Sequence, residues 1–122
     1  MPGCDAARIM RDYLDAFAER DFARARRCLS DSQFCYVSPL STFNSADTFI
    51  TDISRLGAIL ERMDILRIFA EGPELCAILT ITVRMSEPRT IPIALWATVV
   101  DGRIVRMQAF FDGRDYDSLF EA

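Results

Sequence analysis

The sequence contains no lysine and no histidine, and each absence excludes a class of chemistry. Its 14 basic residues are therefore all arginine. Without lysine there is no Schiff-base catalysis, and without histidine there is no Ser-His or Cys-His pair and no imidazole ligand for a metal. The chain also has no glycine-rich phosphate loop and no clustered set of cysteines. We therefore expect neither a cofactor nor a metal site.

Positive charge, long apolar runs and a leader-like segment are also missing. The net charge of -4 argues against nucleic acid as a partner. The apolar stretches are far shorter than a membrane span, and the N-terminus has no apolar core of the kind found in signal peptides. We therefore expect a cytoplasmic protein with no membrane partner. The 4 cysteines have no C-x-x-C spacing, so we predict that they are reduced and buried.

The length and the apolar content set the size of the fold. A chain of 122 residues, 51% of them apolar, can bury a single substantial core. No repeat, low-complexity segment or linker divides it. We predict one domain over residues 1–122.

Apolar residues at helical spacing predict helices in the first half of the chain. One amphipathic helix covers about residues 5–19, and a short second helix follows a cap at Asp21. A third helix follows a cap at Asn44 or Ser45. A short strand over residues 34–37 lies between the second and third helices.

After Met63 the apolar period changes from helical spacing to two. This pattern predicts strands over residues 65–70 and 75–85, and then a hairpin whose arms flank the turn Asp101-Gly102. Helices followed by antiparallel strands indicate an α+β architecture. We expect a curved, mostly antiparallel sheet that wraps around the helices.

The first arm of the hairpin is apolar on both faces. Ile93 and Leu95 lie on one face, while Ala94 and Trp96 lie on the other. A sheet with two apolar faces has to be covered on both, by helices, by a second chain or by a ligand.

The sequence resembles the SnoaL-like and ketosteroid-isomerase-like branch of the nuclear transport factor 2-like superfamily over nearly its whole length. The similar segments are Y-L-D-A-F-A-E-R-D-F running into L-S-D, then Y-V-S-P, and then P-I-A-L-W-A-T-V-V-D-G-R-I-V-R-M-Q-A-F-F-D. The resemblance implies a cystatin-like cone, in which a curved sheet wraps around three helices from the N-terminal half. In that family, one sheet face lines a pocket at the open end of the cone, and the opposite face commonly forms a dimer interface.

The resemblance also implies which residues surround the pocket. Tyr13 matches the family's helix tyrosine, and alternation from the positions that line the isomerase pocket assigns one face of the hairpin to the cone. The predicted pocket consists of Tyr13, Phe17, Tyr36, Ser38, Ile53, Met85, Ala94, Trp96, Met107, Ala109 and Phe111.

The same alternation directs Ile93, Leu95 and Phe110 outwards. A monomer seldom exposes a contiguous apolar patch of several hundred Å², so we predict that a second subunit covers these residues in a homodimer. The alternative cover is a loop or the short C-terminal helix that we predict over residues 113–120.

The family's catalytic residues carry over only in part. Ketosteroid isomerase uses an Asp base, a Tyr and a protonated Asp. In the resemblance the base falls at Ser38 and the second Asp at Ala94, while the acid of limonene-epoxide-hydrolase-like members falls at Ala109. Tyr13 and Asp112 remain as catalytic candidates. Tyr13 is equally suited to the core, and Asp112 to capping a turn or pairing with an arginine.

Two hypotheses follow for the function. The first is that the cone binds a small apolar cyclic or polyketide-like molecule, with or without isomerising, cyclising or hydrolysing it. The alternative is a non-catalytic dimeric interaction module whose cone is filled by its own side chains. The superfamily hosts unrelated activities, so the resemblance does not decide whether the protein is an enzyme.

Overall fold

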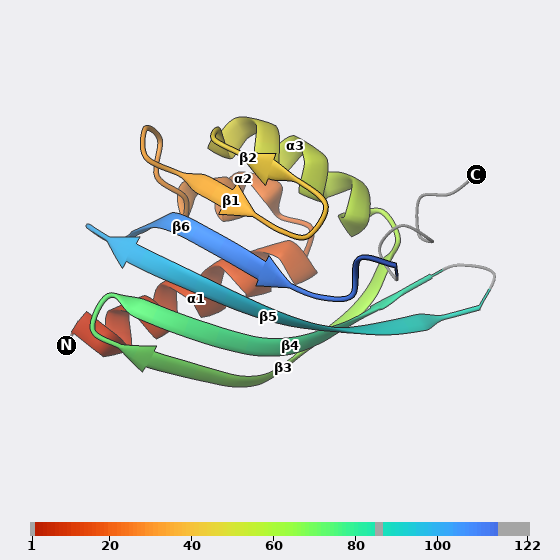
Figure 1. The fold of residues 1–122 in the computed structure, drawn as a ribbon. Coiled ribbons are helices and arrows are strands. Elements are labelled where there is room, and N and C mark those ends of the chain that lie inside the picture. The colour runs from red at the N-terminus through yellow and green to blue at the C-terminus, as the bar shows by residue number, and fades with distance from the viewer. Residues whose placement is uncertain (1, 85–86, 115–122) are drawn as a thin grey trace.

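The computed structural model describes residues 2–84 and 87–114 (Figure 1). The elements, in chain order, are α1 (Pro2–Ala18), α2 (Phe22–Arg27), β1 (Cys35–Val37), β2 (Thr42–Phe43), α3 (Ala46–Gly57), β3 (Leu60–Glu71), β4 (Glu74–Val83), β5 (Arg89–Val100) and β6 (Arg103–Phe110).

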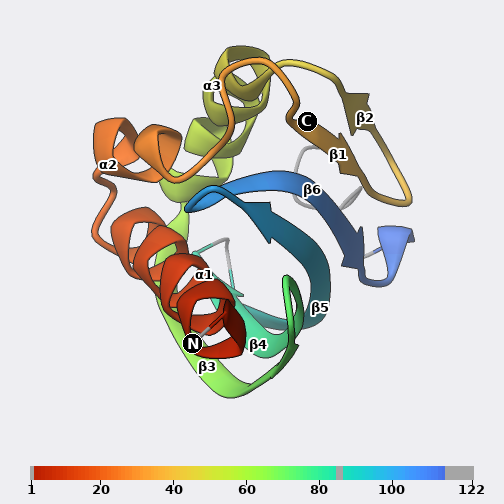
Figure 2. The same cartoon turned by 90° about the vertical axis from the view of Figure 1, so that its left-hand side faces the viewer.

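The strands form one mixed, curved sheet. Its 6 strands lie in the order β2-β1-β6-β5-β4-β3, in which β1 runs parallel to β6 and every other pair is antiparallel. Figure 2 shows the sheet curving around α1, with α2 and α3 above α1 in that view. The α+β cone with a mostly antiparallel sheet is thus present as predicted.

The helices begin where their caps predict. The Asp21 carboxylate accepts a hydrogen bond from the backbone N–H of Arg24 at 3.1 Å, which fixes the start of α2. Ser45 does the same for α3, accepting from the N–H of Thr48 at 3.3 Å. In α1, buried side chains recur every three or four residues, so that one stripe of the helix faces the sheet.

The hairpin between β5 and β6 turns at Asp101-Gly102, as predicted. Both residues have positive φ, 53° and 77°, as a two-residue type I′ turn requires. The pairing then shifts by one residue: Val99 lies opposite Ile104, but Thr98 lies opposite Arg106. Val105 is therefore an extra residue in β6, a β-bulge.

Because of this bulge, the face of β5 that lies inside the cone is the opposite of the one predicted by alternation. Pairing without it would place Trp96 opposite Met107, which is how alternation alone assigns the two faces. With the bulge, Leu95 pairs with Ala109 and Ala97 with Met107. Directly opposite residues share a sheet face, so Leu95 and Ala97 are buried inside the cone.

Four predicted orientations are corrected as a result. Ala94 and Trp96 lie on the convex face, whereas Ile93 and Leu95 point into the cone. The outward orientation of Phe110 is not among the corrections: this side chain lies on the convex face and is 48% exposed.

Other differences are confined to element ends and short elements. β3 begins at Leu60, earlier than the period-two pattern indicates, and the short strand β2 is not among the predicted strands. Met85 and most of the predicted C-terminal helix, residues 115–120, lie outside the described residues.

Two further observations concern the part of the chain that the structure describes. Cys28, Cys35 and Cys76 are free thiols. No helix in these ranges is long and apolar enough to cross a bilayer.

We expect Gly57→Ala to destabilise the fold, because α2 packs against the C-terminal end of α3 at this position. A Cβ on Gly57 would lie 2.4 Å from the ring tip of Phe22, which is itself packed against Phe17 with ring centroids 6.1 Å apart. Overpacking of this kind costs about 1–3 kcal/mol in the free energy of unfolding, measurable by urea denaturation. In a Phe22→Leu background the cost should fall below ~1 kcal/mol. An equal cost in both backgrounds would rule out the ring as the cause.

Candidate functional site

A cavity lies inside the cone, between the concave face of the sheet and the inner sides of α1 and α3. Its volume is about 60 Å³. Tyr13 is buried, whereas Ser38, Ser41, Asp52 and Phe111 are half-buried, so the cavity runs from a closed end within the core towards an end bordered by these four residues.

Most of the predicted pocket residues line this cavity. They come from both halves of the chain: α1 and α3 on one side, β1 and β6 with the residues just after them on the other. These residues are Tyr13, Phe17, Tyr36, Ser38, Ile53, Met107, Ala109 and Phe111.

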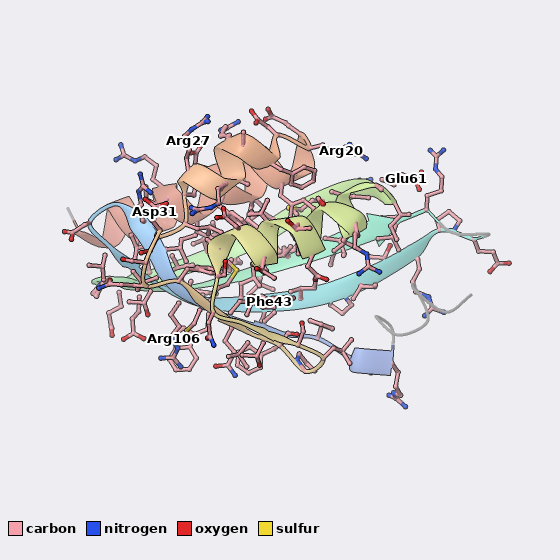
Figure 3. The ribbon with its side chains drawn as sticks, turned by 90° about the horizontal axis from the view of Figure 1, so that it is seen from above. Arg20, Arg27, Asp31, Phe43, Glu61 and Arg106 are labelled. Atoms are coloured by element: carbon pink, nitrogen blue, oxygen red, sulfur yellow. The ribbon has the colours of Figure 1, made fainter. Side chains whose placement is uncertain are left out.

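Ala94 and Trp96 do not reach the cavity. Trp96 is 39% exposed on the convex face, where its Nε1 donates to a Glu74 carboxylate oxygen at 3.0 Å. The guanidinium of Arg106 lies 4.6 Å from the Trp96 ring centroid. Figure 3 shows Arg106 projecting from β6 away from the helices.

Several cavity residues were not predicted. Most are apolar residues of the helices and the sheet: Leu14, Phe49, Leu56, Met63, Leu79, Ile81, Ile91, Ile93 and Leu95. The important omissions are polar, namely Asp52 on α3 and Ser41 in the loop between β1 and β2. Asp52 follows Phe49 by three positions and precedes Ile53, so the helical period of α3 already places it at the edge of the inward stripe.

Tyr13 is the most deeply buried polar residue of the cavity. Burial raises the pKa of its phenol far above the ordinary value, and the electrostatic influence of Tyr36 acts in the same direction. The hydroxyl therefore stays protonated over the physiological range. It can donate a hydrogen bond to a ligand, but it cannot act as a base.

The positions that carry the acids in related enzymes have no acid here. The Ser38 hydroxyl accepts hydrogen bonds from the backbone N–H groups of Leu40 and Ser41, at 3.3 and 3.2 Å, and so holds its own loop in a turn. Ala109 lines the cavity with a methyl group, and Ala94 lies on the other face of the sheet. Asp52 is therefore the carboxylate that the described cavity offers.

Asp112 is engaged outside the cavity. Its carboxylate accepts from the backbone N–H of Arg114 at 3.0 Å and from the Arg114 guanidinium at 2.9 and 3.1 Å. These hydrogen bonds lower the pKa of Asp112. The geometry is that of a turn cap with an ion pair. Among the residues that the structure describes, no group of acidic or cysteine side chains is arranged to hold a metal ion.

Comparisons with known proteins identify the family to which this fold is similar. Residues 10–107 match the family model of the SnoaL-like domain. A search of the curated proteins gives no significant match.

Solved structures share the fold at low sequence identity. An NTF2-like protein from Cytophaga hutchinsonii superimposes with a TM-score of 0.77 at 20% identity, covering 93% of this chain and 92% of that one. An LEH-like epoxide hydrolase from M. tuberculosis gives 0.81 at 22% identity, covering 95% and 89%. A protein with a ketosteroid isomerase-like fold from Catenulispora acidiphila, solved in complex with trimethylamine, gives 0.75 at 14% identity, covering 85% of each chain.

The raised pKa of Tyr13 predicts a loss of stability at high pH. Above pH ~10 the unfolded state ionises its tyrosines, while folded Tyr13 keeps its proton, so the free energy of unfolding falls as pH rises. This one residue contributes at most about 1.4 kcal/mol per pH unit. Urea denaturation at pH 9 and 11 should therefore show a smaller decline for Tyr13→Phe than for the parent. Identical declines would show that Tyr13 titrates freely in the folded state.

Proposed function

Because the chain belongs to the SnoaL-like domain family, we propose that its cone binds a compact, mainly apolar small molecule. The observation that carries this proposal is the composition of the cavity wall. Polar groups from Tyr13, Ser38, Ser41 and Asp52 converge on a cavity that is otherwise apolar, and this combination is typical of ligand sites.

The size of the cavity limits the ligand. A volume of about 60 Å³ is well below the ~300–1,000 Å³ of common ligand pockets and the ~150 Å³ of a cavity that holds benzene. A steroid or a polyketide does not fit. A suitable ligand is compact, and it either extends beyond the end bordered by Asp52 or displaces a flexible wall residue such as Met63. The trimethylamine bound to the Catenulispora acidiphila protein supports a ligand of this size.

Any chemistry in this site would use Tyr13 and Asp52. Tyr13 supplies a neutral hydrogen-bond donor at the closed end, and Asp52 supplies a carboxylate at the half-buried end. A neutral donor and a carboxylate in one cavity suit proton transfer at a carbon or oxygen atom of a compact substrate. Isomerisation, cyclisation and hydrolysis are all compatible with this pair.

A second candidate function is favoured by the same small volume. A cone filled by its own side chains leaves the outer sheet face as the working surface. On that face Phe69, Cys76 and Trp96 lie in one cross-strand row, and Ile78, Ala94 and Phe110 in the next. Phe69 is 53% exposed and Phe110 48%, so the rows form a partly exposed apolar patch, over which the Arg67 and Arg106 guanidiniums lie against the Phe69 and Trp96 rings. We therefore keep the homodimer as a proposal, with this patch in place of Ile93 and Leu95.

Ala109→Leu tests the small-molecule function, because it fills the cavity from β6. Ligand-observed NMR with a panel of small cyclic alcohols, ketones and amines should show saturable binding to the parent and at least ~10-fold weaker binding to the variant. Ala94→Leu makes the same change on the convex face and should leave the affinities unchanged. Ala109→Val is the milder alternative if overpacking by leucine prevents folding. If the parent binds no panel member, or if Ala109→Leu still binds, the proposal fails.

Phe110→Arg tests the homodimer. A charge at the β6 end of this patch should weaken association by roughly 30-fold or more, the effect of losing an interface hot spot. Light scattering after size exclusion, over a range of concentrations, measures the change. Leu40→Arg alters a similarly exposed apolar side chain in the β1–β2 loop and serves as the matched control. A parent that is monomeric throughout the range would refute the dimer.

A further inference from the structure

The described part of the cavity wall carries charge of one sign. Asp52 is the one charged residue among the described residues that line it, and no arginine does so. Arg55 lies 3.7 Å from the Asp52 carboxylate, but its side chain is 64% exposed and sits on the solvent side of α3. Because that pair is largely exposed to solvent, its attraction is weak, and the Asp52 carboxylate remains the one charge on the described wall.

The rest of the wall is rich in aromatic rings. Tyr36 and Phe49 lie against each other with centroids 4.5 Å apart, and Tyr13, Phe17 and Phe111 also border the cavity. Ring faces are electron-rich and attract cations, most strongly where water is excluded. Tyr13 adds a ring and a neutral hydroxyl, since its raised pKa keeps it protonated.

We propose that the ligand is a compact organic cation, an alkylated amine or a quaternary ammonium group, held between the aromatic wall and Asp52. This inference rests on the proposed small-molecule function and adds the charge of the ligand. A cation gains both the ring faces and the carboxylate, whereas a neutral molecule of the same shape gains only the apolar contact. An anion would face Asp52 with no arginine in the described wall to compensate.

Choline and its carbon isostere 3,3-dimethylbutan-1-ol form a matched pair of probes, equal in shape and different in charge. NMR titrations should show choline binding the parent at least ~10-fold more tightly than the alcohol. In Asp52→Asn this ratio should fall below ~3-fold, because choline loses more affinity than the alcohol does. Asp47→Asn, on the same helix but outside the cavity wall, should keep the parent's ratio. A parallel titration with 3,3-dimethylbutyrate, an anion, should show the weakest binding.

The outcomes separate this inference from the proposal on which it rests. If the alcohol binds as tightly as choline and Ala109→Leu abolishes both, the cone binds small molecules but the cation preference is wrong. If Asp52→Asn leaves the ratio of the parent unchanged, Asp52 does not hold the charge, and the inference is overturned. If neither these probes nor the wider panel binds the parent, the small-molecule function itself fails.

Discussion

The arrangement of this protein depends on a single extra residue in one strand. Val105 shifts the pairing of β6 with β5 by one position. Because the side-chain period of a strand is two, the β6 residues after the bulge share a sheet face with the other set of β5 residues. It brings Leu95 opposite Ala109 inside the cone and leaves Trp96 outside. The contents of the cavity and the composition of the outer face both follow from this register.

Local signals in the sequence were sufficient for much of the fold. The caps at Asp21 and Ser45, the stripe on α1 and the Asp101-Gly102 turn each involve residues close together in the chain, so their physics is readable there. The bulge at Val105 has no comparable local signal in the sequence, because it depends on which strand register packs both sheet faces best. Alternation from the resemblance therefore assigns the β6 residues to the cavity correctly. It assigns the two faces of β5 the wrong way round.

The candidate site shows the same division. Tyr13 and Ser38 were found because the family resemblance points to their positions, and both lie at the cavity. The resemblance does not point to Asp52, although the helical spacing of Asp52 from Phe49 places it beside the inward stripe of α3. The small volume of the cavity cannot be predicted from the sequence, because it depends on how closely the large side chains of α1, α3 and the sheet fit together.

The position of Trp96 has a spectroscopic consequence. It is the only tryptophan in the chain, and it lies on the outer face, hydrogen-bonded to Glu74 and covered by Arg106. Its indole emission therefore samples the convex surface and not the interior of the cone. Dissociation of the proposed homodimer across that face would change the emission, whereas a molecule entering the cavity would leave it nearly constant. One natural fluorophore thus allows assembly to be followed independently of occupancy.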